Sequence, residues 1–370
     1  MFAILKHLLV IHKQQDRQID IIKNNTTSLF FENFIAYNKI SNIRLIDEIT
    51  ETYDVYVGIY DPYIVFEWKK RGKKTIFFCN LWFLRFSDTD IDSYIIDAHE
   101  LLIDALIDKY SDNHHNMIFL AYILCDSIYY RSTDWKIVQN DLFLRLKNKI
   151  TLLWPVLYPK LYQKKQNPAK ILFQLWWQVN PISSVFFYEL YFNVINKILS
   201  WLDKSVYHDK IYILINREIQ PLAQKVFDWW QVLSTMPQEE YQMLLSEAKA
   251  LFHPFGINTF FESTYYDVPN FILPEQHIWH IKSLIQYTWD LQKINKSSIL
   301  MYSIKKYGLS WENEMLFIDF LSDRYKEFLN SDYDFSNFYA FLEHPQHYLS
   351  YTWEVTINGN IDILLREIIE

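Results

Sequence analysis

A glycine, a threonine and a glutamate stand close together in residues 253–276, just before an apolar run that two prolines bracket. The chain of 370 residues contains five glycines, so Gly256 stands out. Glycine permits a tight turn and a close approach of the backbone to a ligand. Thr259 and Glu262 are three residues apart, which on a helix puts their side chains near one face. The carboxylate of Glu262 could then accept hydrogen bonds from the two vicinal hydroxyls of a ribose.

Further polar residues flank this pair. Asn258 can cap the helix that begins at the glycine, as the threonine can. Glu275, Gln276 and His280 follow the apolar run, and their side chains can hydrogen-bond sugar hydroxyls. Plainer interpretations stay open, in which the glycine is an ordinary turn residue, the glutamate on the helix is solvated and the histidine merely starts another helix.

Strand-like and helix-like patterns alternate along the chain, which predicts parallel sheets covered on both faces. The expected strands are 54–62, 75–83, 116–126, 150–159, 171–177, 210–216, 229–235 and 269–274. The expected helices are 63–74, 92–110, 183–202, 217–227, 237–252, 258–267 and 277–292. The fold class is therefore α/β, with two Rossmann-like domains, a cleft between them and a helical C-terminal stretch.

The polar segment 160–170 contains Pro168 and is interpreted as a linker. We expect an N-terminal, acceptor-side domain at 1–160, a C-terminal, donor-side domain at 161–309 and a helical segment at 310–370 that packs back on them. Ligands of such sheets bind at the carboxyl ends of the strands, where helix N-termini attract anions. Ser183, at the start of one expected helix, is a candidate for contact with a diphosphate.

The order and spacing of these pieces resemble the donor-nucleotide motif of GT-B glycosyltransferases, especially the peptidoglycan N-acetylglucosaminyltransferase and the macrolide-type transferases. Their pattern is a small-residue turn, T-x-x-E, a proline ten residues past the Thr, and an apolar strand that ends in Pro. The matching residues are Gly256, Thr259, Glu262, Pro269 and Pro274. The resemblance covers 171–292 and, more weakly, 54–83.

The resemblance implies roles for these residues. Gly256 and Thr259 would face the diphosphate and Glu262 would hold the ribose, while Glu275, Gln276 and His280 would approach the donor sugar. Ser234 lies in the stretch 232–237, where the backbone of the family contacts the base. Asn180 matches the Asn-Pro of the first loop in the second domain. The implied ligands are a nucleoside-diphosphate sugar, with no other cofactor, and an acceptor that is a small molecule or lipid-linked.

Three departures from the family pattern leave other functions open. Residues 1–50 contain no glycine, so the opening Gly-rich loop has no counterpart. Trp176 and Trp177 replace two glycines, and Asp267 stands where the family often has Gly. Tryptophan does not let the backbone approach a phosphate as glycine does. The alternatives are a catalytically silent GT-B-like protein that binds a partner or ligand, and a sugar-nucleotide epimerase.

An inverting transfer also needs a general base to deprotonate the acceptor hydroxyl. The candidates in the acceptor-side half are Asp61, at the end of an expected strand, and Asp88 and His99 further along. Each also has a structural interpretation, as an ordinary loop or helix residue. We expect no metal site, because His114 and His115 have no third ligand at a suitable spacing.

Composition excludes some partners. The net charge of −8 argues against general binding of nucleic acid, which needs clustered Lys and Arg. No segment is long and apolar enough to span a bilayer, and the first 13 residues lack the pattern of a signal peptide. We therefore expect a cytoplasmic protein, with peripheral membrane contact through exposed aromatic residues left open.

Overall fold

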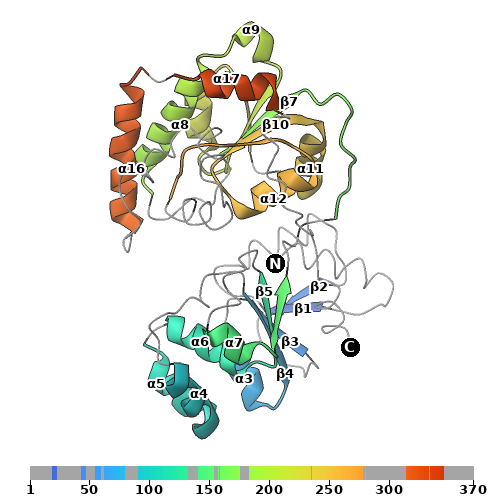
Figure 1. Ribbon diagram of the computed structural model, residues 1–370, viewed down its shortest axis with the longest axis vertical. Coiled ribbons are helices and arrows are strands. Elements are labelled where there is room, and N and C mark those ends of the chain that lie inside the picture. The colour runs from blue at the N-terminus through green and yellow to red at the C-terminus, as the bar shows by residue number, and fades with distance from the viewer. Residues whose placement is uncertain are drawn as a thin grey trace. The chain divides into compact units, whose positions relative to one another are not determined.

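The protein is described by a computed structural model, in which the chain divides into two compact units, 1–159 with 355–370 and 160–354 (Figure 1). The residues that the structure describes are 19–22, 43–46, 55–59, 62–79, 91–112, 114–131, 141–153, 157, 159–175, 183–234, 236–277, 280, 314–332 and 334–345. All statements below concern these residues.

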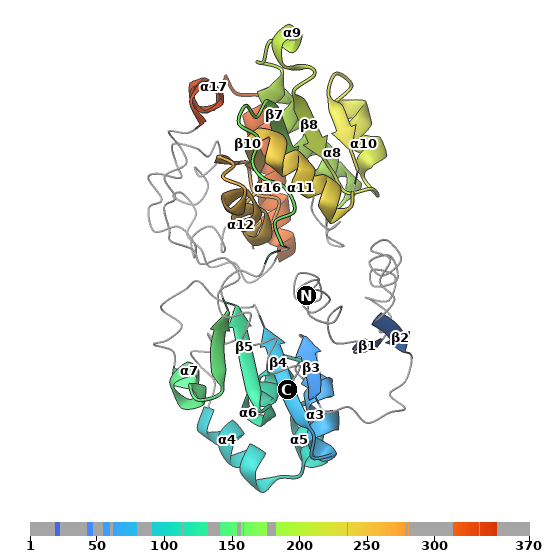
Figure 2. The ribbon, with the colours of Figure 1, turned by 90° about the vertical axis from the view of Figure 1, so that its right-hand side faces the viewer.

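The first unit contains a four-stranded parallel sheet with the order β3-β4-β5-β6, three strands of which are labelled side by side in Figure 2. The strands are β3 (Val55–Ile59), β4 (Lys74–Cys79), β5 (Ser127–Arg131) and β6 (Ile150–Leu153). The helices are α3 (Pro62–Lys70), α4 (Ile91–Glu100), α5 (Ile103–Tyr110), α6 (His114–Leu124) and α7 (Asp141–Leu146). A separate parallel pair is formed by β1 (Ile19–Ile22) and β2 (Ile43–Ile46), which the sequence did not predict.

Two predictions for this unit were wrong. The apolar run 116–126, expected as a strand, lies mostly in helix α6, and β5 follows it. Side chains from Met117 to Ile123 are all buried, so the helix is apolar all round and its sequence lacks a polar stripe. A short run of this kind cannot be told from a buried strand by periodicity alone. The single helix expected at 92–110 is instead two helices, α4 and α5.

The second unit contains a five-stranded parallel sheet with the order β11-β10-β7-β8-β9. The strands are β7 (Lys170–Gln174), β8 (Ile211–Leu214), β9 (Gln231–Leu233), β10 (Ala248–His253) and β11 (Asn270–Ile272). The helices are α8 (Val185–Leu199), α9 (Lys204–Tyr207), α10 (Gln220–Val226), α11 (Gln238–Glu247), α12 (Ile257–Tyr265), α16 (Glu314–Leu329) and α17 (Ser336–Glu343).

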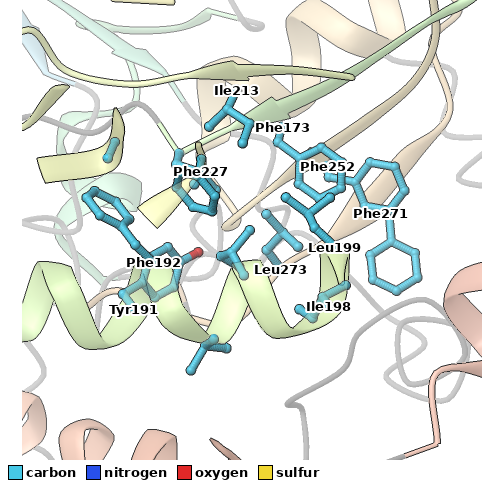
Figure 3. Close-up of a cluster of buried hydrophobic side chains, with 14 of the residues drawn as sticks. Phe173, Tyr191, Phe192, Ile198, Leu199, Ile213, Phe227, Phe252, Phe271 and Leu273 are labelled. Carbon is cyan, nitrogen blue, oxygen red and sulfur yellow. The ribbon is translucent and has the colours of Figure 1, made fainter. Parts of the chain in front are cut away.

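Alternating side chains of this sheet enter two different cores. Phe173 and Phe252 stack with 4.5 Å between ring centroids and belong to the core beneath α8, α10, α16 and α17 (Figure 3). Leu172 and Leu251, the preceding residues of the same strands, enter the core beneath α11 and α12. The aromatic residues that are so frequent in this chain thus fill the larger of the two cores.

The strand β10 was not predicted, because the helical pattern of 237–252 continues through Ala, Lys and Leu. The helix ends at Glu247, and the next six residues insert between β7 and β11. Leu251 and Phe252 are both fully buried there, on opposite faces of the sheet. Tertiary burial has therefore overridden the helical propensity of this segment.

No helix in the described ranges is long and apolar enough to cross a membrane. Several large aromatic side chains are more than half exposed on the second unit, namely Phe186, Trp201 and Trp229. Peripheral membrane contact therefore stays a prediction. The expected helix at 277–292 and the tail beyond 345 lie largely outside the described residues.

One lysine fixes the C-terminal helix α16 beside α8, where Figure 1 also places it. The ammonium of Lys197, on α8, donates to the carbonyls of Phe328 at 2.8 Å, Leu329 at 2.9 Å and Ser331 at 2.5 Å. Leu329 ends α16 and Ser331 lies just beyond it, where backbone carbonyls run out of partners within the helix, although the Phe328 carbonyl also accepts from the N–H and hydroxyl of Ser331. A cation there also complements the negative end of the helix dipole.

Replacement of Lys197 by Met keeps most of the aliphatic stem and removes the three donors. We expect Lys197→Met to lower the free energy of unfolding of this unit by about 1.5–3 kcal/mol, the range for hydrogen bonds that involve a charged group. Urea unfolding, followed by circular dichroism, measures the change. The exposed Lys225 on α10 supplies the control, and equal stabilities of Lys197→Met and Lys225→Met would contradict this account of α16.

Candidate functional site

All five strands of the second sheet end at one edge, because they are parallel. In the order β11-β10-β7-β8-β9, the chain continues from β7 to β8 on one side and from β10 to β11 on the other side. The connections therefore leave β7 and β10 in opposite directions. Open α/β sheets bind ligands outside the carboxyl ends of their strands, at such a switch point. The segment after β10 holds Gly256 and α12, and the segment after β11 holds Glu275 and Gln276. The fold therefore places the two halves of the predicted motif at one edge of the sheet.

A buried chain of three polar side chains crosses the switch point. The hydroxyl of Tyr241 donates to Oε1 of Gln174 at 2.5 Å, and Nε2 of Gln174 donates to Oγ1 of Thr259 at 3.1 Å. Gln174 is the last residue of β7 and Thr259 lies in the first turn of α12. The sequence predicted a role for the threonine but not its contact with Gln174, 85 positions away, nor the contact of Gln174 with Tyr241, 67 positions away. The threonine hydroxyl is thus held in place at the point where the diphosphate is predicted.

Helix α12 begins directly after Gly256. The backbone of Gly256 has φ −92° and ψ 125°, which any residue can adopt. This conformation does not require glycine, so a tight turn gives no reason for Gly256, and a close approach of ligand to this buried backbone stays a prediction. Asn258 is exposed, and the N-cap position is taken by Gly256, which has no side chain to cap the helix. The N–H groups of its first turn are the kind that bind anions.

Glu262 lies toward the connection between β9 and α11. Its side chain is half-buried, and Oε1 accepts a hydrogen bond from Nε2 of Gln238 at 3.2 Å. Ser234, also half-buried, directly follows β9, and Gln238 begins α11. The predicted ribose-binding residue thus contacts the element that starts just after the predicted base-binding segment.

The end of α12 explains the departure at Asp267. This residue has φ 52°, in the left-handed region that favours glycine. Its N–H donates to the Thr264 carbonyl, and the N–H of Val268 donates to the Ser263 carbonyl at 2.8 Å. This pair of bonds is a Schellman motif, whose left-handed position is most often Gly. Asp267 therefore replaces glycine at a helix end rather than at a ligand.

A second buried cluster, which the sequence did not predict, joins the end of β10 to the start of β11 and to α12. Nδ1 of His253 lies 2.8 Å from the Pro254 carbonyl, and Nε2 lies 3.1 Å from Oδ1 of Asn270. The hydroxyl of Ser263 donates to the same Oδ1 at 2.6 Å. Burial lowers the pKa of His253 to about 4, so the ring is neutral at pH 7 and donates through one nitrogen. The cluster ties α12 to both strands.

Glu275 carries a carboxyl group that is almost completely buried. Its side chain is 3% exposed, and Oε2 makes no hydrogen bond within the described part of the chain. Burial raises the pKa of this carboxyl to about 7. Native proteins rarely leave such an atom unsatisfied, so the group is suited to accept a donor from a ligand.

The residues close to Glu275 are also buried, and burial keeps the two histidines among them neutral. The backbone N–H of Gln276 donates to Nδ1 of His280 at 3.2 Å, so the neutral imidazole of His280 carries its proton on Nε2. The rings of His277 and His280 lie with centroids 3.8 Å apart. Burial lowers the pKa of His277 to about 4 and that of His280 well below its usual value. This corner of the site is dry and built from neutral donors and acceptors.

Other predicted residues are not brought into this group by the described structure. Ser183 is half-buried just before α8, and Ser184 is the N-cap, its hydroxyl accepting from the N–H of Phe187 at 3.2 Å. His99 is exposed on α4 in the first unit. The predicted residues outside the described ranges are Asp61, Asp88, Trp176, Trp177 and Asn180. Within the described ranges, no cluster of three His, Cys, Asp or Glu side chains could hold a metal ion.

Comparisons with known proteins identify the fold. No protein-family model matches the chain, and no curated protein matches it. A Listeria monocytogenes protein named provisionally as a UDP-N-acetylglucosamine 2-epimerase has a TM-score of 0.52, with 10% identity over 99% of this chain and 92% of its own. The structure of LpCGTa in complex with UDP has a TM-score of 0.50, with 10% identity over 99% of this chain and 95% of its own.

The chain has the two-domain GT-B fold. The expected fold class is confirmed, since both units contain parallel sheets and helices and the likeness extends over almost the full length. At 10% identity the likeness concerns the fold alone.

The buried carboxyl of Glu275 makes the stability of the second unit depend on pH. Its folded pKa of about 7 lies above the usual value of 4.5, so folding favours the protonated form. That contribution is fully present below pH 4.5 and is lost as the pH rises through 7. Burial lowers the pKa of His253 and His277 from 6.5 to about 4, so these rings also change stability below about pH 6.5, but equally in wild type and in a variant at position 275.

We expect Glu275→Gln to gain stability relative to the wild type as the pH rises from 5 to 8. The gain should be about 2–3 kcal/mol, at about 1.4 kcal/mol for each unit of pKa shift. Urea unfolding across this pH range measures it, with Glu239→Gln at an exposed position on α11 as the control. A difference between Glu275→Gln and wild type that does not change with pH would disprove the burial effect.

Proposed function

We propose that the protein is a GT-B glycosyltransferase, which moves a sugar from a nucleoside-diphosphate sugar to a small-molecule or lipid-linked acceptor. The observation that carries the proposal is the convergence of the motif at the carboxyl edge of the second sheet. Gly256, Thr259 and Glu262 follow one strand there, and Glu275 and Gln276 follow the next strand of the sheet. The GT-B fold agrees with this use of the edge.

In this proposal the diphosphate lies against the N-terminal turns of α12 and α8. Both helices start at the carboxyl edge, and their first N–H groups and positive dipole ends favour an anion. The same groups can neutralise the diphosphate as it leaves, so the transfer needs no metal ion. The held hydroxyl of Thr259 adds a further donor.

The two carboxylates take different parts of the donor. Glu262 is half-buried and accepts a hydrogen bond from Gln238, and a carboxylate has several lone pairs with which it can also accept from ribose hydroxyls. Glu275 is dry, and its Oε2 takes a hydroxyl of the donor sugar, beside Gln276 and His280. The general base for the acceptor hydroxyl is sought in the first unit, where Asp61, Asp88 and His99 stay the candidates.

A sugar-nucleotide epimerase is the second candidate, because a protein provisionally named as one shares the fold. An epimerase would change a nucleotide sugar without an acceptor, and nuclear magnetic resonance of the incubated sugar distinguishes the two. A catalytically silent protein would bind no nucleotide sugar at this edge. Both alternatives are thus separable from transfer by simple binding and turnover measurements.

We expect one nucleoside diphosphate to raise the melting temperature, because a ligand that binds the native state stabilises it by mass action. Differential scanning fluorimetry with UDP, GDP, dTDP, ADP and CDP tests this. At 100 times its Kd the ligand should stabilise the protein by about 2.7 kcal/mol. No shift with any of the five, nor with their glucose esters, would reject a donor-binding enzyme.

We expect Glu262→Ala to weaken binding of that nucleotide by roughly 1–3 kcal/mol, because buried hydroxyls of the ribose lose their acceptor. The fold should survive, since the side chain lies outside both cores. Isothermal calorimetry compares it with Glu239→Ala, an exposed glutamate on the neighbouring helix α11. Equal affinities of the two variants would remove Glu262 from the ribose site.

A further inference from the structure

Two tyrosine hydroxyls hold two consecutive carbonyls in the loop after β11. The hydroxyl of Tyr191 donates to the Pro274 carbonyl at 3.1 Å, and that of Tyr325 donates to the Glu275 carbonyl. Both tyrosines are fully buried. They come from different helices, α8 and α16, whereas the loop belongs to the sheet. The segment that carries the dry carboxyl is therefore tied from outside the sheet.

These bonds begin where the sheet ends. The last bond of the ladder runs from the Leu273 N–H to the His253 carbonyl at 2.8 Å. The next two carbonyls accept from the tyrosines, and the N–H of Gln276 donates to His280. Hydrogen bonds to side chains therefore hold the backbone of the three residues that follow the last ladder bond.

The tyrosines themselves are held firmly. The ring of Tyr325 lies 5.8 Å from that of Tyr191 and 5.9 Å from that of Phe187, between ring centroids. Lys197 of α8 also binds two carbonyls at the C-terminal end of α16. Burial raises the pKa of both tyrosines well above 10, so the hydroxyls keep their protons and remain donors.

We infer that Tyr191 and Tyr325 are positioning residues for the donor-sugar half of the site, which makes sugar binding depend on the C-terminal helix α16. The inference rests on the proposed function, in which Glu275 and Gln276 contact the sugar. A carbonyl held at residue 275 restrains its Cα, and thereby the direction in which the side chain of Glu275 leaves the backbone. The diphosphate and the ribose are bound by other segments, so their binding does not depend on this tie.

The decisive comparison separates a nucleoside diphosphate from its sugar ester. Tyr325→Phe and Tyr191→Phe each keep the ring and remove one hydroxyl. The matched control is Tyr339→Phe on α17, whose hydroxyl also donates to a backbone carbonyl, that of Trp201 after the end of α8. Because α8 runs back from the carboxyl edge of the sheet, this control removes the same kind of bond at the opposite edge.

We expect Tyr325→Phe to bind the stabilising nucleoside diphosphate with a Kd within about twofold of wild type, and its glucose ester roughly tenfold more weakly. Tyr191→Phe should act in the same direction, and Tyr339→Phe should change neither affinity. Calorimetry gives both constants. Equal changes for the diphosphate and the ester, or no change for either, would overturn the positioning role.

A measurement without ligand tests the tie directly. Amide hydrogen exchange, read by mass spectrometry, should be at least about tenfold faster in Tyr325→Phe for peptides that cover 273–277, and unchanged for peptides from β7 and β8. Unchanged exchange in 273–277 would reject the inference even if the proposed function holds. Faster exchange in a protein that binds no nucleotide would support the tie and reject the proposed function.

Discussion

The central strand β7 constrains the whole second unit. It pairs with β8 on one side and β10 on the other, and all its neighbours are parallel to it. Its side chains alternate between two cores, so Phe173 enters the aromatic core and Leu172 the core under α11 and α12. Since every strand runs the same way, every following loop must emerge at one edge. The gathering of the motif residues follows from this single arrangement.

Polar groups at that edge fall into two kinds. Gln174, Thr259 and Tyr241 satisfy one another in a dry interior, where unpaired groups would cost about 1–3 kcal/mol each. Such a network fixes α12 relative to β7 and keeps the helix start in one place. Glu275 is different. The backbone N–H of the next residue, Gln276, donates to His280, whereas Oε2 of Glu275 has no hydrogen-bond partner within the described residues. In the proposed function the network holds the Thr259 hydroxyl beside the diphosphate, and Oε2 of Glu275 accepts from the sugar.

Local signals predicted most of the second unit. Helix α8 has a serine N-cap and a broad apolar face, and the expected helix at 258–267 and strand at 269–274 contain most of α12 and all of β11. The failures have physical causes. Helix α6 has no polar stripe to reveal its period, and β10 continues a helical pattern that only burial between two strands overrides. The partners of Thr259 and Glu275 lie 85 and 50 residues away, so no local pattern could join them.

The helix α16 lies outside the sheet, yet it contacts the loop at the carboxyl edge of the sheet. The hydrogen-bond ladder between β10 and β11 ends at Leu273. A loop with no further hydrogen bonds would sample many conformations after that point. Two buried hydroxyls remove that freedom from the residues that bear the dry carboxyl and its neighbouring amide. Since one of them comes from a helix about 50 residues later in the chain, the shape of this corner is set by packing between α8 and α16 rather than by the sheet. A change on the buried face of α16 could therefore alter which ligand group the carboxyl meets, while the five strands and the helix starts stay as they are.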